Sequence, residues 1–308
     1  MVLFQFIHIP SLKKIFQGPF LISLAACLWA TDALIRYPAL HNNLDPFFLV
    51  LFEHLLGVLL LFPWFLKNRG LIFKFHFKQW AATIFTGICG SALGTIFFTL
   101  SFLYLNPSIV ILLQKLQPLL VVFIAYFFLG ERPSSKFYFW AVIAFLSAVA
   151  LSIPQWNVYS WPLYLKGLQY ALGAMILWSA STITSKFILN AIPPHTALFL
   201  RFFFGLIPLI LYFFFHQERL LACFSLLHSK KAIWALTYLC LVPGIFAMLI
   251  YYYGLNYTPA STAIFIELLY PIAAIILNTT FLHVSFSLIQ IIAGTVLIFS
   301  IFKLSFSK

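Results

Sequence analysis

Five strongly charged side chains lie deep inside long apolar runs of the sequence: Asp32, Glu53, Lys115, Arg201 and Glu267. A charge at the centre of a bilayer costs about 2.5–3.5 kcal/mol on insertion scales, so it normally faces other protein groups or a water-filled cavity. Acids and bases gathered in one place suit a zwitterionic ligand, because a base can bind its carboxylate and an acid its ammonium group. We therefore interpret the five charges as candidate substrate-binding residues.

The apolar runs place these charges at similar depth. Glu53, Lys115, Arg201 and Glu267 each lie about seven residues into a run, or roughly 10–11 Å along a helix, and Asp32 lies about 13 residues in. A hydrocarbon core is about 30 Å thick, so all five are expected within roughly 5 Å of its midplane. One shared polar layer is predicted.

A structural alternative is that the charges form ion pairs that only tie helices together. The sequence allows two such pairs, Glu53 with Lys115 and Arg201 with Glu267. Intramembrane charges usually find partners whatever their function. Buried ion pairs are nevertheless poor stabilisers compared with apolar packing, which argues against a purely structural use of so many charges.

Trp29 is the sixth candidate substrate-binding residue. It lies three residues before Asp32, so ring and carboxylate are expected on one helix face. An aromatic ring beside an acid suits a cationic or aromatic ligand group. Trp178 repeats the position in the second half of the chain, where Ser181 and Thr182 replace the acid.

For several neighbouring residues, a structural role is the first interpretation. His54 points about 100° away from Glu53 and is expected to be a hydrogen-bonded core histidine, with proton coupling as the alternative. Arg36 is expected near a helix end, with its charge reaching the interface. The small residues Gly87, Gly90, Ser91 and Gly94 favour close helix packing, with backbone lining of a substrate path as the alternative.

Motifs of catalytic and metal sites are absent from the sequence. It has no HExxH, P-loop or GxSxG motif, and no cluster of His and Cys residues. Its four cysteines show no paired or metal-like spacing. We expect neither an enzyme nor a metal or other cofactor.

The composition indicates an integral membrane protein. Apolar residues make up 63% of the 308-residue chain and charged residues only 8%, against about 25% charged residues in a soluble domain. The net charge of +12 comes from basic residues placed singly or in small groups between apolar runs. This pattern fits loops at an anionic membrane surface and argues against nucleic acid as a partner.

The apolar runs predict an all-α protein with ten transmembrane helices, because runs near 20 residues do not suit barrel strands. One stretch, Asn106 to Ser135, shows the pattern in full: Asn-Pro starts a helix, an apolar run contains Lys115, and Gly130 ends it. The predicted spans are 19–38, 46–66, 80–103, 108–129, 137–153, 164–186, 195–215, 232–254, 260–281 and 286–302.

The two halves of the chain resemble each other. Superposing Pro118 on Pro271 aligns Gln114 with Glu267, with Lys115 one place along. Superposing Pro46 on Pro194 aligns Glu53 with Arg201 and Gly57 with Gly205. Trp29 likewise corresponds to Trp178. We predict two five-helix repeats, at 15–153 and 162–305. Five spans per repeat turn the second repeat upside down, an architecture of many secondary transporters with the site between the repeats.

The lysines and arginines of the loops predict the orientation. One side of the first repeat carries Lys13, Lys14, Lys67, Arg69, Lys74, Lys78, Arg132 and Lys136, whereas the other carries only Arg36. The basic side is expected to be cytoplasmic, and ten spans then put both termini there. Lys186, Lys303 and Lys308 agree with this assignment, but Arg219, Lys230 and Lys231 lie in a loop that it places outside.

The sequence resembles the EamA-type members of the drug/metabolite transporter superfamily over nearly its whole length. The run Phe128-Leu129-Gly130-Glu131-Arg132 resembles a family signature, and 254–261 resembles the family's link into the ninth span. The second repeat departs from the signature at Leu282-His283-Val284. The resemblance implies an alternating-access metabolite carrier, a multi-pass protein of the bacterial inner (plasma) membrane; similar members in intracellular bacteria carry S-adenosylmethionine.

Together these features predict a secondary active transporter of a small polar, zwitterionic metabolite, such as an amino acid or S-adenosylmethionine. Glu267 is expected to bind the substrate cation or a coupling proton from the same cavity as Lys115. The alternatives are a drug or nucleotide-derivative exporter of the same fold and a non-transporting membrane scaffold. The expected partners are a small-molecule substrate and the lipid bilayer.

Overall fold

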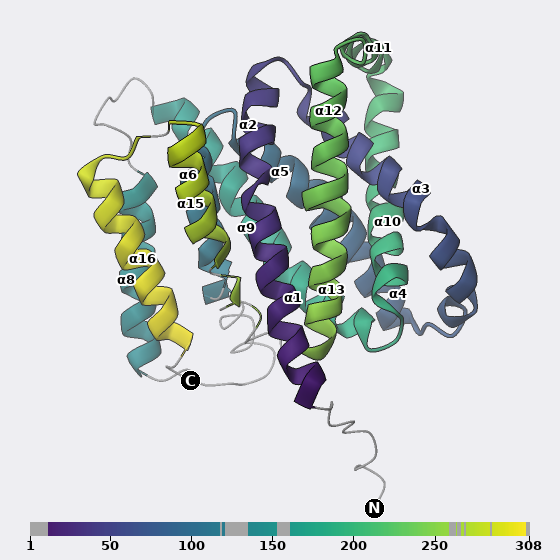
Figure 1. Ribbon diagram of the computed structural model, residues 1–308, viewed down its shortest axis with the longest axis horizontal. Helices are drawn as coiled ribbons and strands as arrows, with labels where there is room; N and C mark the ends of the chain where they lie inside the picture. Colours follow the sequence, from purple (N-terminus) through teal and green to yellow (C-terminus); the bar gives the residue numbers. More distant parts are fainter. Residues whose placement is uncertain are drawn as a thin grey trace, which may run out of the picture.

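The computed structural model describes residues 12–117, 119–120, 135–152, 161–258, 263, 266–267, 269–283 and 285–305. Within these ranges the chain forms helices and connecting loops and contains no strand, so the predicted all-α class is confirmed. Figure 1 shows a bundle in which α1 starts at one end and α11 lies at the other.

The helices of the first half are α1 (Leu12–Ala30), α2 (Asp32–His41), α3 (Pro46–Ile72), α4 (Phe77–Phe85), the π-helix η1 (Thr86–Leu93), α5 (Gly94–Ser101), α6 (Pro107–Leu113), the 3₁₀-helix η2 (Gln114–Leu116) and α8 (Ser135–Ser152). Those of the second half are α9 (Trp161–Leu189), α10 (Pro194–Phe215), α11 (Gln217–Leu226), α12 (Lys230–Leu239), the π-helix η4 (Cys240–Phe246), α13 (Ala247–Tyr257), α15 (Leu269–Phe281) and α16 (Leu288–Ser305).

Six helical segments of the described chain are long and apolar enough to cross a membrane. They are Gln17–His41, Pro46–Ile72, Phe77–Ser101, Pro162–Leu189, Pro194–Phe215 and Lys230–Tyr257. The shorter apolar helices are Pro107–Leu116, Tyr138–Ala148, Leu269–Phe281 and Leu288–Lys303. The protein is therefore a multi-pass membrane protein, whereas the count of ten spans stays a prediction. Much of the predicted fourth span, and the first part of the ninth, lie outside the described residues.

Capping side chains explain where two important helices begin. The Asp45 carboxylate accepts hydrogen bonds from the backbone N–H groups of Phe47 and Phe48, at 2.8 and 2.9 Å, ahead of α3. Asn106 caps α6 in the same way through the N–H of Ser108, and Pro107 opens the helix. The helix start predicted at Asn-Pro is confirmed.

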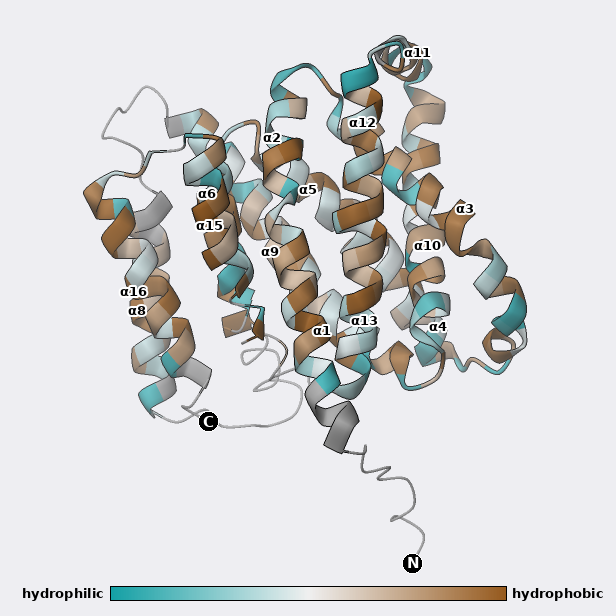
Figure 2. Cartoon of the chain, viewed as in Figure 1, coloured by the Kyte–Doolittle hydropathy of each residue, from teal (hydrophilic) through white to brown (hydrophobic). Residues whose placement is uncertain are grey.

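Large apolar side chains cover the outside of the bundle. Leu59, Ile210 and Ile292 are more than half exposed, at 61%, 56% and 56%. Figure 2 shows apolar residues along the lengths of the helices, with hydrophilic residues concentrated near their ends. This surface is the one that a helical bundle presents to lipid.

The first span bends at Thr31, between α1 and α2. The Thr31 hydroxyl donates to the Leu28 carbonyl at 2.7 Å and accepts a hydrogen bond from Tyr238 of α12 at 2.8 Å. A threonine that bonds back to its own helix competes with the regular hydrogen-bond pattern. The break places Asp32 and Arg36 at the start and in the middle of α2.

Candidate functional site

A cavity inside the bundle brings the sequence-predicted site residues together. Its lining includes Trp29, Asp32, Glu53 and Lys115 from the first half and Arg201 and Glu267 from the second. All are buried apart from the partly exposed Trp29. Residues of both halves thus line one cavity, while their common depth in the membrane and the binding of a substrate to them stay predictions.

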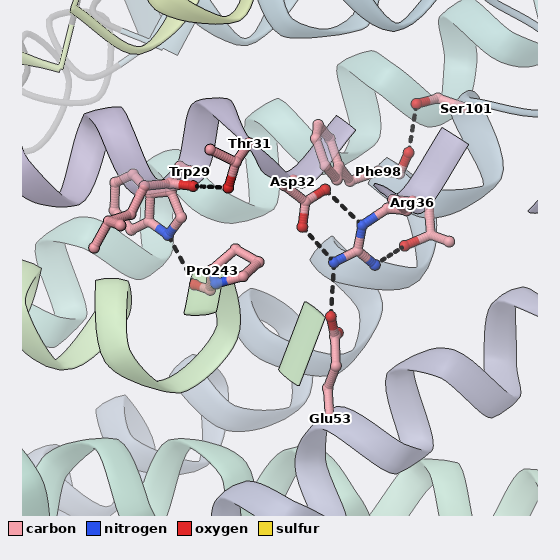
Figure 3. Close-up of polar contacts among 10 residues, drawn as sticks. Trp29, Thr31, Asp32, Arg36, Glu53, Phe98, Ser101 and Pro243 are labelled. Carbon is pink, nitrogen blue, oxygen red and sulfur yellow. Dashed lines mark hydrogen bonds and ion pairs between the residues drawn. The ribbon is translucent and has the colours of Figure 1, made fainter. Parts of the chain in front are cut away.

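Asp32 and Glu53 share a single guanidinium, that of Arg36. Arg36 Nε and Nη2 donate to the two Asp32 oxygens at 2.7 and 2.8 Å, and Nη2 also donates to Glu53 Oε1 at 2.7 Å. Arg36 Nη1 donates to the Thr99 hydroxyl of α5 at 2.9 Å. We call Asp32, Arg36 and Glu53 the charge triad; Figure 3 shows them converging in one place. The triad binds α2, α3 and α5 to one another.

The expectation that Arg36 is an interfacial residue is wrong. Its side chain is only 3% exposed and it lines the cavity. The reason is its spacing, since residues four apart on a helix lie on one face and Arg36 follows Asp32 by four. That spacing was visible in the sequence.

Arg201 of α10 makes hydrogen bonds to uncharged groups. Its Nη1 donates to the hydroxyls of Ser181 and Tyr252 at 3.1 and 3.2 Å, and Nη2 donates to the Gly90 carbonyl at 3.0 Å. The ion pairs of the described residues include no carboxylate bound to Arg201. Its charge is held in place by dipoles and remains available to an anion.

Lys115 and Glu267 face the same cavity from η2 and from the segment before α15. The Lys115 ammonium lies 5.1 Å from the centre of the Tyr270 ring, and Glu267 Oε1 accepts a hydrogen bond from the Tyr251 hydroxyl at 2.8 Å. The two charges attract each other but form no direct ion pair in the described chain. The structural alternative that pairs Glu53 with Lys115, and Arg201 with Glu267, is wrong, because neither pair is among the ion pairs of the described residues.

Two π-helical segments, η1 and η4, lie within the two spans that correspond in the predicted repeats. A π-helical turn widens the helix, disturbs the regular carbonyl pattern and often marks a functional site. Carbonyls of both segments accept side-chain hydrogen bonds: Gly90 of η1 from Arg201, and Pro243 of η4 from the Trp29 indole at 3.1 Å. Figure 3 shows the bond between Trp29 and Pro243. Neither π-helical segment was expected from the sequence, in which only a run of small residues and the pair Pro243-Gly244 coincide with them.

Close helix packing, the favoured interpretation of the glycines in η1 and at the start of α5, is observed. A Cβ on Gly87 would lie 3.0 Å from the Arg201 carbonyl oxygen and 3.1 Å from the Gly205 nitrogen, so η1 touches the backbone of α10. A Cβ on Gly94 would meet the Trp178 indole nitrogen at 2.7 Å. The glycines therefore bring η1 close to Arg201 and leave room for a tryptophan in the cavity wall.

Aromatic rings form much of the remaining wall: Trp29, Phe98, Trp178, Tyr251, Tyr252 and Tyr270. Trp29 and Tyr251 lie with ring centres 5.0 Å apart, and Phe98 and Trp178 with centres 4.9 Å apart. Two buried polar atoms of the lining, Gln114 Oε1 and Trp178 Nε1, have no hydrogen-bond partner among the described residues. The wall thus combines aromatic faces with two buried polar atoms that have no partner among the described residues.

His54 behaves as a hydrogen-bonded core residue. Its Nδ1 lies 2.8 Å from the Val50 carbonyl oxygen, and its Nε2 lies 2.9 Å from the Ser91 hydroxyl. Both ring nitrogens are thereby occupied. No group of three or more His, Cys, Asp or Glu side chains in the described part of the chain could hold a metal ion.

Comparison with known proteins finds one matching family and a similar transporter. The model of the EamA-like transporter family matches residues 16–153 and 165–306. The riboflavin transporter ImpX of Fusobacterium nucleatum subsp. nucleatum (strain ATCC 23726 / VPI 4351) is 28% identical over 305 residues, which cover 94% of this chain and 97% of that protein.

A solved crystal structure has the same fold. It aligns with 92% of this chain and 95% of its own, at a TM-score of 0.61 and 18% sequence identity. The two family matches cover both halves of the chain, which contain the six predicted site residues. The chain belongs to the EamA-like transporter family.

Proposed function

We propose that this transporter moves a small zwitterionic metabolite through the aromatic-lined cavity by alternating access. The observation that carries the proposal is the set of three charges, Lys115, Arg201 and Glu267, that line the cavity without an ion-pair partner among the described residues. A solute with one carboxylate and one ammonium group complements such a set. The charge triad, by contrast, satisfies most of its own charge internally.

In this proposal Arg201 binds the substrate carboxylate, because its guanidinium is already oriented by Ser181, Tyr252 and Gly90. A preoriented donor loses little entropy when it binds an anion. Glu267 binds the ammonium group, and Lys115 keeps the acid ionised. Trp29 and Trp178 contribute ring faces to the solute, which favours zwitterions with an aromatic part, such as S-adenosylmethionine or an aromatic amino acid.

A second candidate substrate is riboflavin, favoured by the relative named as a riboflavin transporter and by the aromatic wall. A flavin has a planar ring system with hydrogen-bonding edges. Gln114 Oε1 and Trp178 Nε1, which have no partner among the described residues, offer an acceptor and a donor for such edges. A flavin, however, leaves the charges of Arg201 and Glu267 without counter-charges.

The proposed topology has ten spans in two inverted five-helix repeats, at 15–153 and 162–305, in a bacterial inner membrane with both termini cytoplasmic. Support comes from the corresponding positions of η1 and η4 and from the two family matches. Inverted repeats place the substrate site at their interface. Residues of both halves line the cavity, as that arrangement requires.

The test is uptake into proteoliposomes that contain the purified full chain, with radiolabelled amino acids, S-adenosylmethionine and riboflavin as separate probes. We expect uptake of a zwitterionic probe, competed by other zwitterions and lost in Arg201→Gln and Glu267→Gln. Arg69→Gln, an exposed arginine of α3, is the matched control. Uptake of riboflavin alone would replace the first candidate by the second, and no uptake of any probe would overturn both.

A further inference from the structure

The charge triad contains two carboxylates and only one guanidinium. Asp32, Arg36 and Glu53 are 6%, 3% and 4% exposed, and they lie in predicted spans. If every group is ionised, the triad carries one negative charge that no ion pair within the triad compensates, in a poorly solvated place. Such a charge is strongly destabilising inside a protein, so the triad is expected to take up a cation.

The two carboxylates differ in how fully they are bound. Asp32 uses both oxygens in a bidentate pair with Arg36. Glu53 receives one hydrogen bond, at Oε1, and its Oε2 has no donor among the described residues. Glu53 also lines the cavity. The free oxygen of Glu53 is therefore the place where a cation can bind and can exchange with the cavity.

A proton fits this place better than a metal ion. Arg36 occupies the space between the carboxylates, so the Asp32 oxygens are already in use. A metal ion needs several oxygen ligands at once, and the triad offers one free carboxylate oxygen. A proton needs only that one oxygen.

We propose that the charge triad is the proton-coupling site of the transporter, with the proton carried on Glu53. This rests on the proposed function, because coupling has meaning only for a carrier. When Glu53 is protonated, Arg36 and Asp32 form a neutral pair. When Glu53 loses its proton, the second carboxylate competes with Asp32 for Arg36, and the attraction between α2 and α3 changes.

The position of the triad connects this proton to the substrate cavity. Asp32 begins α2 directly after the break at Thr31, and Trp29 lies on the other side of that break and bonds to η4. A change in the bond between α2 and α3 therefore acts where the first span bends. Coupling in a carrier requires a two-state element whose equilibrium depends on both ligands. In this proposal the element is the bend at Thr31: the proton acts on it through the triad, and the substrate acts on it through Trp29.

Other titratable or charged groups near Glu53 are placed for different roles. His54 on the same helix is bonded to Val50 and Ser91, and Cys240 of η4 bonds to the Glu53 backbone carbonyl rather than to the carboxylate. The remaining charged or titratable groups of the cavity lining are Lys115, Arg201, Tyr251, Tyr252, Glu267 and Tyr270, and none makes a hydrogen bond to the Glu53 carboxylate. Arg36 is thus its direct charged partner.

Infrared difference spectroscopy of the purified chain tests proton binding without any substrate. The sequence has only six acidic residues, so a protonated carboxyl band can be assigned by single substitutions. We expect such a band at neutral pH, absent in Glu53→Gln and still present in Glu267→Gln, which removes another buried acid of the same cavity. Asp32→Asn should also abolish it, because Glu53 then becomes the sole partner of Arg36. Survival of the band in Glu53→Gln or Asp32→Asn would overturn the proposal.

Transport provides the second readout, with whichever of the amino acids, S-adenosylmethionine or riboflavin the wild type takes up as the probe. We expect an imposed pH gradient to change wild-type uptake, and the ratio of uptake with and without the gradient to fall to one in Glu53→Gln. Glu218→Gln, an exposed acid of α11, should keep the wild-type ratio. A Glu53→Gln carrier that still responds to the gradient, or a wild type driven by sodium instead, would contradict the proposal. Failure of the proposed function would appear differently, as no uptake with a normal carboxyl band.

Discussion

At the scale of single residues, the site separates into charges that satisfy one another and charges that do not. Arg36 is bonded to two acids, whereas Arg201 is bonded to hydroxyls and a carbonyl. The two arginines are therefore expected to respond to substitution in different ways. Loss of Arg36 should lower stability and, in the proposed coupling site, remove the partner of Glu53, whereas loss of Arg201 should affect mainly substrate binding.

For Arg201, the informative change is Arg201→Lys, which keeps the positive charge but loses the planar fork. A hydrogen bond to a charged group contributes about 1.5–3 kcal/mol, and about 1.4 kcal/mol corresponds to tenfold in affinity. We expect the dissociation constant of the transported substrate to rise about tenfold or more, measured by equilibrium binding to the detergent-purified chain. Unchanged affinity in both Arg201→Lys and Arg201→Gln would make Arg201 a packing residue.

For Arg36, the informative change is Arg36→Met, which leaves two buried acids without their cation. Breaking a buried ion pair by removing one partner costs about 3–5 kcal/mol, whereas replacing the whole group by apolar residues is often neutral. We expect a marked fall in the thermal unfolding temperature for Arg36→Met in detergent, and recovery in the triple variant Asp32→Leu, Arg36→Met, Glu53→Leu. The exposed Lys74→Met is the control; an equal loss there would show that any lost cation has the same effect.

The sequence predicts which residues form the site better than it predicts their hydrogen-bond and ion-pair partners. Burial of Asp32, Glu53, Lys115, Arg201 and Glu267 around one cavity follows from their depth in apolar runs, which composition and spacing reveal. The partner of Glu53 could not be read in the same way. The ion pair between Arg36 of α2 and Glu53 of α3 depends on how these two helices pack against each other, which the apolar pattern of the two runs does not specify.

At the scale of helices, the π-helical segments determine where Arg201 can lie. In η1, Gly87 allows contact with the α10 backbone, and Gly90 provides the carbonyl that binds Arg201. The glycines predicted close packing, but the sequence did not reveal the π-helical turns, because the period of the apolar pattern changes over only a few residues. Trp29, bonded to η4, adds a link between the two halves.

The packing of η1 predicts the effect of Gly87→Ala. The added Cβ would lie 2.4 Å from the Phe204 Cβ and 3.0 Å from a backbone oxygen, so neither helix can accommodate it without moving. Overpacking of this kind costs about 1–3 kcal/mol, and we expect both a lower unfolding temperature and weaker substrate binding, because Arg201 shifts with α10. Gly70→Ala in α3 is the matched control: nothing lies within 4 Å of its Cβ, and the change should be neutral or stabilising by up to about 1 kcal/mol. Equal effects of the two changes would exclude the packing explanation.

At the scale of the whole molecule, the two halves contribute opposite charges at related positions. Glu53 aligns with Arg201, and Gln114–Lys115 aligns with Glu267, and members of both pairs line the same cavity. A symmetric pair of repeats would present the same charge twice. In the proposed function, this divergence of the predicted repeats gives the cavity the polarity that suits a zwitterion.

The orientation of the molecule in the membrane is the last prediction. The lysines and arginines of the first-half loops predict residues 67–79 and 130–136 on the cytoplasmic side. The burial of Arg36 removes the basic residue of the first repeat that opposed this assignment, whereas Arg219, Lys230 and Lys231 of the second still oppose it. In a cysteine-free background, Ser135→Cys is expected to resist a membrane-impermeant thiol reagent in intact cells and to react once the cells are opened. Ser229→Cys, in the loop before α12, should react in intact cells, because ten spans place that loop outside despite Lys230 and Lys231. Both positions are exposed in the structure, so the side of the membrane on which each cysteine lies decides whether the reagent reaches it. Labelling of Ser135→Cys from outside would reverse the assignment, and labelling of both positions from the same side would exclude five spans per repeat and, with them, the inverted arrangement.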